Sequence, residues 1–275
     1  MVERAIKLGY IVATPELRVA ETVTAYQGDL DVAFNKLRKL GYHGAELMIL
    51  DPDLVNRSRL ERLSREYGIE IPVLCTGEVY GQGRLSFMDP DQSIRTEAIL
   101  RTKKIVDFAS AFGAQVNIGR LRGRFLPNIP RETSLGWMYT AFEEVTDYAQ
   151  ERDVTMILEP VAHVACNNIN TTQDAIQVVK KVGRDNFRLM VDMFTMNLED
   201  KSMEQSFSDA KPYLTHIHLC DSNRLAPGRG NFDFGKIFNT IKAINYNGYI
   251  SVEIYQYPDK DVVIEETVNV LRPLL

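Results

Sequence analysis

Short apolar runs rich in β-branched residues alternate along the chain with longer stretches in which apolar residues recur every three or four positions. The first pattern is typical of buried strands and the second of amphipathic helices, so their alternation predicts strand and helix units around a parallel sheet. We expect eight strands, at residues 7–12, 44–49, 70–75, 115–118, 155–159, 188–192, 215–220 and 249–253. The clearest helical stretches cover residues 31–42, 94–114, 138–153, 234–249 and 261–275.

The number of these units indicates the architecture. Eight units in 275 residues average about 34 residues each, which agrees with the roughly 250 residues typical of a (β/α)8 barrel. We therefore predict a single α/β domain, a TIM barrel that covers residues 1–275. The alternative is an open, doubly wound sheet, which usually carries a Gly-rich phosphate-binding motif after an early strand. The sequence contains no such motif.

Composition narrows the classes of partner. The chain has 32 Lys and Arg against 37 Asp and Glu, a net charge of -5, without a long run of like charges, so we do not expect a nucleic-acid partner. No apolar run approaches the roughly 20 residues that cross a bilayer, and the first residues do not resemble a secretory signal. We therefore expect no membrane partner and a cytoplasmic location. Cys75, Cys166 and Cys220 are interpreted as reduced thiols.

Candidate chemistry lies where the predicted strands end. The fifth strand ends at Glu159, the sixth at Asp192 and the eighth at Glu253, while the seventh contains His218. In a (β/α)8 barrel the carboxyl ends of the strands form one rim, where active sites are built. The four residues are about one strand-and-helix unit apart, so they should stand side by side on that rim.

Three buried carboxylates at one place repel each other and lose hydration unless a cation neutralises them. Together with one imidazole they form an oxygen-rich site that suits Mn²⁺, with Mg²⁺ or Co²⁺ as alternatives and Zn²⁺ less suited. His216 lies two residues before His218 on the same strand face, so we interpret it as a core histidine. Glu46, at the end of the second strand, points either to the same rim or into the barrel, and it could contact the metal ligands there.

Several motifs carry a family resemblance. The segments ILEP, VDMFTMNLED, HIHLCDSNRLAPGRGNFDF and YISVEI resemble the sugar phosphate isomerase and epimerase superfamily, whose members fold as xylose isomerase-like TIM barrels. The ketose 3-epimerases are the most similar branch. CTGEVYGQGRLSF and VNIGRLRGR in the first half are similar to the 5-keto-L-gluconate epimerase type.

The resemblance implies an isomerase that acts on a keto-sugar or keto-sugar acid through an enediolate. It implies that Glu159, Asp192, His218 and Glu253 hold one divalent metal, and that Glu159 and Glu253 also serve as the catalytic acid and base. It makes Arg224 a substrate-binding residue and suggests a homodimer or homotetramer.

Two positions depart from the family pattern. Ketose 3-epimerases usually carry His three residues after the metal-binding Asp and Glu six residues after the first metal-binding Glu; this chain has Thr195 and Ala165 there. Thr195 is a candidate substrate-binding residue. His163, two positions before Ala165, is a second candidate that could partly replace the missing groups, unless it is a solvated loop residue. Arg120, Arg122 and Arg124 are a further cluster that could bind a substrate carboxylate or phosphate, Arg122 above all, unless they form a solvated basic loop.

Three other functions remain to be compared with the epimerase. A lyase that cleaves a 3-keto glycoside, like the C-glycoside deglycosidase subunits, would use the same metal and one base, and would fit the changes at Thr195 and Ala165; it could require a second subunit. A nuclease like the apurinic endonucleases would need many histidines, and this chain has four. A simple binding module has little use for paired glutamates around a metal.

Overall fold

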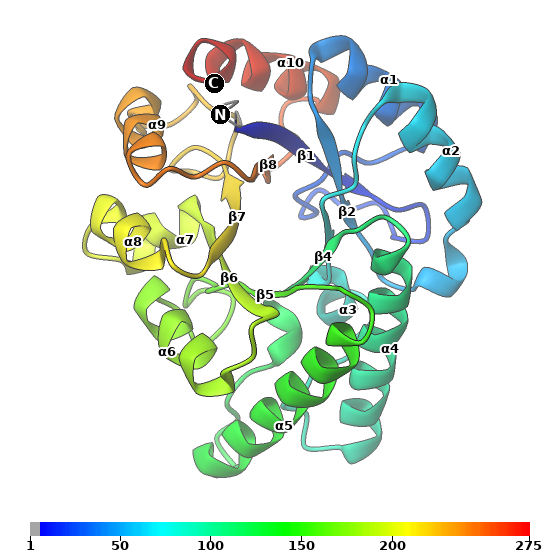
Figure 1. The fold of residues 1–275 in the computed structure, drawn as a ribbon, viewed down its shortest axis with the longest axis vertical. Coiled ribbons are helices and arrows are strands. Elements are labelled where there is room, and N and C mark those ends of the chain that lie inside the picture. The colour runs from blue at the N-terminus through cyan, green and yellow to red at the C-terminus, as the bar shows by residue number, and fades with distance from the viewer. Residues whose placement is uncertain (1–5) are drawn as a thin grey trace.

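The computed structural model describes residues 6–275, and its centre is a closed barrel of eight parallel strands (Figure 1). Each strand pairs with the next along the chain, and the last pairs back with the first, so that Lys7 lies beside Tyr249. This closure confirms the predicted (β/α)8 barrel and excludes the open sheet. The strands are β1 (Lys7–Ala13), β2 (Gly44–Met48), β3 (Val73–Cys75), β4 (Gln115–Ile118), β5 (Met156–Leu158), β6 (Phe187–Asp192), β7 (Leu214–Leu219) and β8 (Tyr249–Val252).

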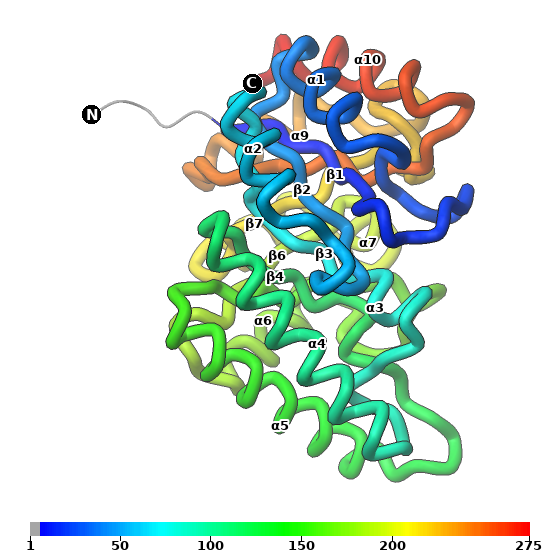
Figure 2. The backbone as a smooth tube through the Cα atoms, turned by 90° about the vertical axis from the view of Figure 1, so that its right-hand side faces the viewer, coloured from blue at the N-terminus to red at the C-terminus, as the bar shows by residue number. Residues whose placement is uncertain are grey.

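Helices follow the strands and surround the barrel, as the two perpendicular views show (Figures 1 and 2). Their buried positions recur at helical spacing, as Leu30, Ala33, Phe34 and Leu37 do in the first one, so that one side packs on the barrel. The α-helices are α1 (Leu30–Leu40), α2 (Arg57–Tyr67), α3 (Gly77–Gly81), α4 (Gln92–Ser110), α5 (Arg131–Gln150), α6 (Thr172–Val182), α7 (Met193–Glu199), α8 (Met203–Ala210), α9 (Phe234–Ala243) and α10 (Lys260–Leu271). Short 3₁₀ helices are η1 (Pro52–Leu54), η2 (Arg120–Arg122) and η3 (Arg272–Leu274).

The start of β3 and the presence of α2 are two of the differences from the sequence-based expectation. β3 begins at Val73 instead of residue 70, because Pro72 has no N–H to donate to a ladder, and Glu70 makes only an isolated bridge with Gly44. α2 lies outside the stretches that periodicity marked most clearly. Only Leu60 and Leu63 of this helix are buried, so its pattern along the sequence is mostly charged and polar.

The interior of the barrel changes from apolar to polar along the strand direction. Val73, Ile157 and Met190 form a small buried apolar cluster. Because alternate residues of a strand point to the same face, Glu159 and Asp192, two residues further along, point to the same interior at the carboxyl ends of β5 and β6. At β3, β5 and β6 the barrel interior therefore has an apolar cluster beneath the polar rim.

The three cysteines are buried, and none forms a disulfide within the described residues, in agreement with the predicted thiols. None of the helices between residues 6 and 275 has the length and apolar character needed to cross a membrane.

Candidate active site

The structure brings the four predicted metal ligands together. Glu159, Asp192, His218 and Glu253 each offer a ligand atom, and these atoms lie within 4.8 Å of one another. All four residues are buried. They come from the carboxyl ends of β5, β6, β7 and β8, as the strand-end argument predicts.

The donor atoms fit a divalent cation. Within residues 6–275, the buried Oδ2 of Asp192 and Nδ1 of His218 have no hydrogen-bond partner. Nδ1 of His218 lies 3.4 Å from Oε1 of Glu159 and 3.2 Å from Oε2 of Glu253, without hydrogen-bond geometry. Buried polar atoms without a partner are costly, and one cation bound between them removes the cost. Three carboxylates and one imidazole thus form a complete candidate metal site.

Each glutamate of the cluster has one oxygen anchored by a neighbouring side chain. Asn117 of β4 donates from Nδ2 to Oε2 of Glu159 at 2.8 Å. Thr24, in the loop after β1, donates from Oγ1 to Oε1 of Glu253 at 2.8 Å. These bonds fix both carboxylates and leave Glu159 Oε1 and Glu253 Oε2 facing the imidazole of His218.

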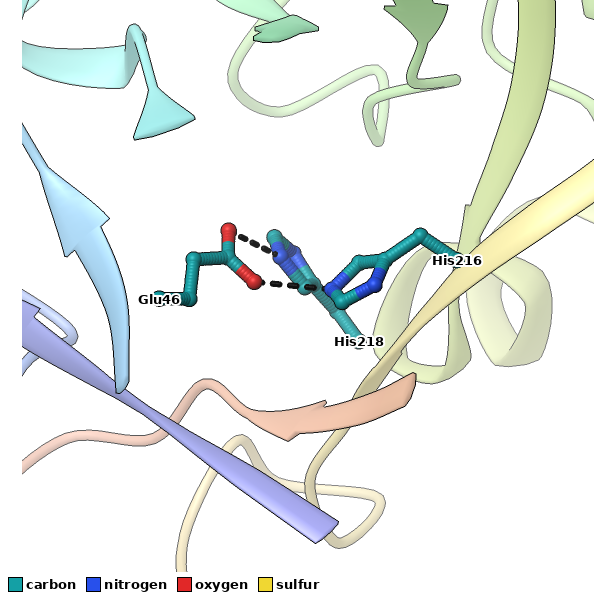
Figure 3. A group of neighbouring side chains, drawn as sticks. All are labelled: Glu46, His216 and His218. Atoms are coloured by element: carbon teal, nitrogen blue, oxygen red, sulfur yellow. Dashed lines mark hydrogen bonds and ion pairs between the residues drawn. The ribbon is translucent and has the colours of Figure 1, made fainter. Parts of the chain in front are cut away.

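His218 is also anchored, through its other nitrogen. Nε2 of His218 lies 2.8 Å from Oε1 of Glu46, and Nε2 of His216 lies 2.8 Å from Oε2 of the same carboxylate (Figure 3). Burial would raise the pKa of Glu46, but the two imidazoles outweigh it and lower the pKa to about 2. Glu46 is therefore an ionised carboxylate held between two rings. His216 is a buried histidine of the barrel interior, as predicted.

Arg224 lies beside the acidic cluster. Its guanidinium pairs with Glu253 and lies 3.5 Å from Oδ2 of Asp192, and it stands over the ring of Phe194. Burial would raise the pKa of Glu253, yet Arg224 and His218 hold it well below its usual range. The backbone of Arg224 has φ 60°, which non-glycine residues adopt rarely and which is often found at functional sites.

A cavity of about 230 Å³ opens next to the ligands. Its polar side includes Glu159, Glu253 and Arg224, and Thr195 also lines it. Much of the remaining wall is apolar and comes from the loop after β5 and from α7, with Val161, Ala162, Val164, Ala165 and Phe194. The cavity is therefore bounded by the carboxylates on one side and by a largely apolar wall on another. Thr195 and Ala165, the two positions that depart from the family pattern, both line this cavity.

The prediction that Arg122 binds substrate is wrong. Arg122 is completely buried, and all five N–H groups of its guanidinium are directed to protein oxygens. Its acceptors are the side-chain and main-chain oxygens of Asn168 and the carbonyls of Gly119, Glu159 and Ile169. Arg122 ties the loop after β4 to the loop after β5. Within that cluster Arg120 is the arginine that lines the cavity.

The structure does not place His163 in the cavity. Its side chain is 65% exposed, and Nδ1 lies 2.6 Å from Oε1 of Glu199, which also accepts a bond from the His163 backbone N–H. Its neighbours Ala162 and Val164 line the cavity instead. His163 therefore orders the loop after β5 and does not replace the family's missing polar groups.

Sequence reasoning missed Thr24, Asn117 and Glu78, the partner of Arg120. Asn117 carried a usable signal, because a polar residue near the end of an apolar strand stands out. Thr24 carried none, since it lies in an irregular loop. Arg120 donates from Nη2 to Oε1 of Glu78 at 2.9 Å, and both residues line the cavity.

Sequence comparisons find relatives that match most of this chain. The probable ketose 3-epimerase of Synechocystis is 25% identical over 244 residues, 86% of this chain and 82% of the relative. The 3-dehydro-D-guloside 4-epimerase of Escherichia coli is 24% identical over 230 residues, 80% of this chain and 85% of the relative. Both relatives are named as epimerases, in agreement with the predicted isomerase class.

A solved structure and a family model support the fold. The D-allulose 3-epimerase of Methylomonas sp., solved with D-allulose, superposes with a TM-score of 0.81 at 21% identity and covers 99% of this chain and 98% of its own. The family model described as xylose isomerase-like TIM barrel matches residues 34–274. The chain therefore belongs to the xylose isomerase-like TIM barrel family.

Proposed function

We propose that the protein is a divalent-metal-dependent epimerase of a keto-sugar or keto-sugar acid. The observation that carries the proposal is the pair Glu159 and Glu253, whose carboxylates flank Nδ1 of His218 and line one cavity. An epimerisation needs a base on one face of the substrate and an acid on the other. The epimerase relatives support the same class of reaction.

The chain's own residues account for the proton transfers. One glutamate removes the proton from the carbon beside the carbonyl, which leaves an enediolate, and the other glutamate returns a proton to the opposite face and so inverts the centre. The hydrogen bonds from Asn117 and Thr24 keep the two carboxylates in place during both transfers. The chemistry that a bound divalent ion supplies is Lewis acidity toward the carbonyl oxygen, which favours the negative charge of the enediolate.

We propose Mn²⁺ as the ion, with Mg²⁺ and Co²⁺ as alternatives. Three oxygen donors and one nitrogen donor match the preferences of these ions better than those of Zn²⁺. The ligands would be Glu159, Asp192, His218 and Glu253. Arg224 would stay at the edge of the cluster, where its charge is available to a substrate oxygen.

Substrate contacts would come from Arg224, Thr195 and Arg120, which all line the cavity. The two arginines suit a keto-sugar acid, as in the 5-keto-L-gluconate epimerase type, because a guanidinium binds a carboxylate through paired hydrogen bonds. Both guanidinium groups have a carboxylate partner, Glu78 for Arg120 and Glu253 for Arg224. Arg224 is the stronger candidate for the anionic group because it lies beside the proposed metal ligands, where the substrate would react.

A lyase that cleaves a 3-keto glycoside is the second candidate. It is favoured by the uncharged wall at Ala165 and Val164, which leaves room for a substituent on the sugar where ketose 3-epimerases carry a carboxylate. Such a lyase would use the same metal and one glutamate, and it could need a second subunit.

We also propose a single domain that acts in the cytoplasm as a homodimer or homotetramer. Val19 and Tyr257 support the assembly, since they are 82% and 67% exposed beside one groove.

The test is proton exchange in D₂O. The Mn²⁺-loaded protein is incubated with ketoses, 5-keto sugar acids and 3-keto glycosides, and NMR follows deuterium incorporation and products. An epimer that carries deuterium beside the carbonyl supports the epimerase and identifies its substrate. Release of an aglycone without an epimer supports the lyase. If the metal is bound and neither an epimer nor an aglycone forms from any of the three substrate classes, the result contradicts both the epimerase and the lyase proposal.

A further inference from the structure

We propose that Glu46 is a positioning residue: its carboxylate fixes the protonated nitrogen of His218, so that Nδ1 of this ring is the nitrogen presented to the metal. The inference deepens the proposed function, because it concerns how the chain prepares its only nitrogen ligand. It rests on the contacts of Glu46, His216 and His218 (Figure 3).

Glu46 reaches the histidines from the other side of the barrel interior. It lies on β2, whereas both histidines lie on β7, and these strands are separated by β1 and β8 in the closed sheet. The two rings stand nearly perpendicular to each other, with their centres 5.4 Å apart. Each directs Nε2 to a different oxygen of Glu46 at 2.8 Å. All three side chains are completely buried, so no solvent competes for these bonds.

Proton counting determines which nitrogen can bind the metal. A nitrogen that binds a metal carries no proton, so a neutral imidazole bound through Nδ1 has its proton on Nε2. Each oxygen of Glu46 lies 2.8 Å from one Nε2, and a carboxylate that shares its two oxygens between two rings accepts hydrogen bonds from them, so Glu46 favours this arrangement for His218. Nδ1 of His218 then faces Glu159 and Glu253 without a hydrogen-bond partner inside the described chain, as a ligand atom should.

His216 makes the carboxylate necessary. Two rings each need an acceptor, and only a carboxylate offers two acceptor oxygens at the required spacing. In Glu46→Gln the amide has one oxygen and one NH₂ group, so one ring must accept at Nε2 and move its proton to Nδ1. In His218 such a proton would lie on the ligand atom and oppose metal binding.

The first experiment observes the imidazole protons directly. The chain has four histidines, so ¹H–¹⁵N spectra of protein labelled at histidine are simple, and the His216→Phe variant assigns the signals. We expect two slowly exchanging Nε2–H signals in the metal-free wild-type protein, and one in Glu46→Gln. A wild-type His218 that carries its proton only on Nδ1 would overturn the proposal. This measurement is independent of activity and of metal loading.

The second experiment measures Mn²⁺ binding by titration calorimetry. We expect Glu46→Gln to weaken Mn²⁺ binding by about 10- to 100-fold, as is typical when a partner of a metal-binding histidine is lost. Adding His216→Phe to this variant removes the competing ring and leaves the amide oxygen to His218, so binding should recover in part. If Glu46→Gln acted only through a general packing defect, the second core substitution would add to that defect, and the double variant would bind Mn²⁺ more weakly still.

The matched control is Glu70→Gln. Glu70 also accepts from two side chains, Lys7 and Tyr249, but at the opposite end of the barrel, so its variant should bind Mn²⁺ normally. Unchanged affinity in Glu46→Gln, or a double variant that binds more weakly still, would contradict the positioning role. Failure of the proposed function would look different: the wild-type protein would exchange no substrate proton while its two Nε2–H signals remained.

Discussion

The two halves of the barrel contribute differently to the site. The second half, β5 to β8, contains all four proposed ligands, Glu159, Asp192, His218 and Glu253. The described part of the first half, β1 to β4 with its loops, contains none of these four residues, but it holds three of them through hydrogen bonds. These bonds run from Thr24 to Glu253, from Asn117 to Glu159 and between Glu46 and His218.

Asp192 is the exception, because its own half holds it. Oδ1 of Asp192 accepts the backbone N–H of Thr195 at 2.7 Å and so caps α7. The comparison suggests a division of labour: one half provides the atoms that bind and react, and the other fixes their orientation. Changes in the second half should therefore remove a step of the reaction, whereas changes in the first half should only lower its rate.

The largest effect is expected in the second half, from Glu253→Gln. The amide keeps the shape and an oxygen ligand but cannot transfer a proton. We expect kcat to fall by about 10²- to 10⁴-fold, equivalent to about 2.7–5.4 kcal/mol, while the protein still binds Mn²⁺. Steady-state kinetics and metal analysis of the same sample check this. Normal turnover would exclude the assigned role of Glu253.

Removal of the metal should have the next largest effect. Chelation leaves Asp192 Oδ2 and His218 Nδ1 buried without a hydrogen bond in the described chain, so Mn²⁺ should stabilise the fold. At 100 times its Kd the gain is about 2.7 kcal/mol, seen as a higher Tm by calorimetry. His218→Ala should abolish this dependence on Mn²⁺. A Tm of the wild-type protein that ignores Mn²⁺ would contradict the metal site.

The clustering of the four proposed ligands was predictable from sequence because their geometry is local. Each one lies at or near the end of a strand, and strand alternation fixes which residues face the interior, so Asp192 and His218 followed from the pattern alone. The four substrate candidates were harder, because a loop residue points where tertiary packing directs it. Arg120 and Arg122 illustrate this: they lie two residues apart in a 3₁₀ turn of three residues and therefore point in different directions.

The supporting residues depended on information that no sequence pattern contains. Thr24 meets Glu253 across 229 positions of the chain, and Asn117 meets Glu159 only because β4 and β5 are neighbours. Glu46 could be suspected from the end of its strand, but its sharing between two histidines depends on the width of the closed barrel. The barrel of eight strand-and-helix units was predictable because each unit repeats a pattern that is local in the sequence.

A change in the first half should have a smaller effect than Glu253→Gln or removal of the metal. Asn117→Ala removes the donor to Oε2 of Glu159, and we expect kcat/KM to fall by about 10-fold. Asn186→Ala is the control, because this amide donates to the carbonyls of Thr146 and Val154, away from the cavity. The control should lose stability but keep its activity. Equal activity losses in the two variants would show that Asn117 acts through stability alone.

The smallest effect is expected from a glycine of the first half. It tests whether the space that Gly119 leaves beside Glu159 is needed for activity. A Cβ at Gly119, just after β4, would lie 2.6 Å from Oε2 of Glu159, whereas a Cβ at Gly136 in α5 would meet no atom within 4 Å. Gly136→Ala should stabilise the protein by about 0.5–1 kcal/mol with unchanged activity, because alanine loses less backbone entropy in a helix. Gly119→Ala should instead displace Glu159 and lower activity. Denaturant unfolding and kinetics on both variants measure the contrast, and full activity in Gly119→Ala would show that the rim tolerates a moved carboxylate.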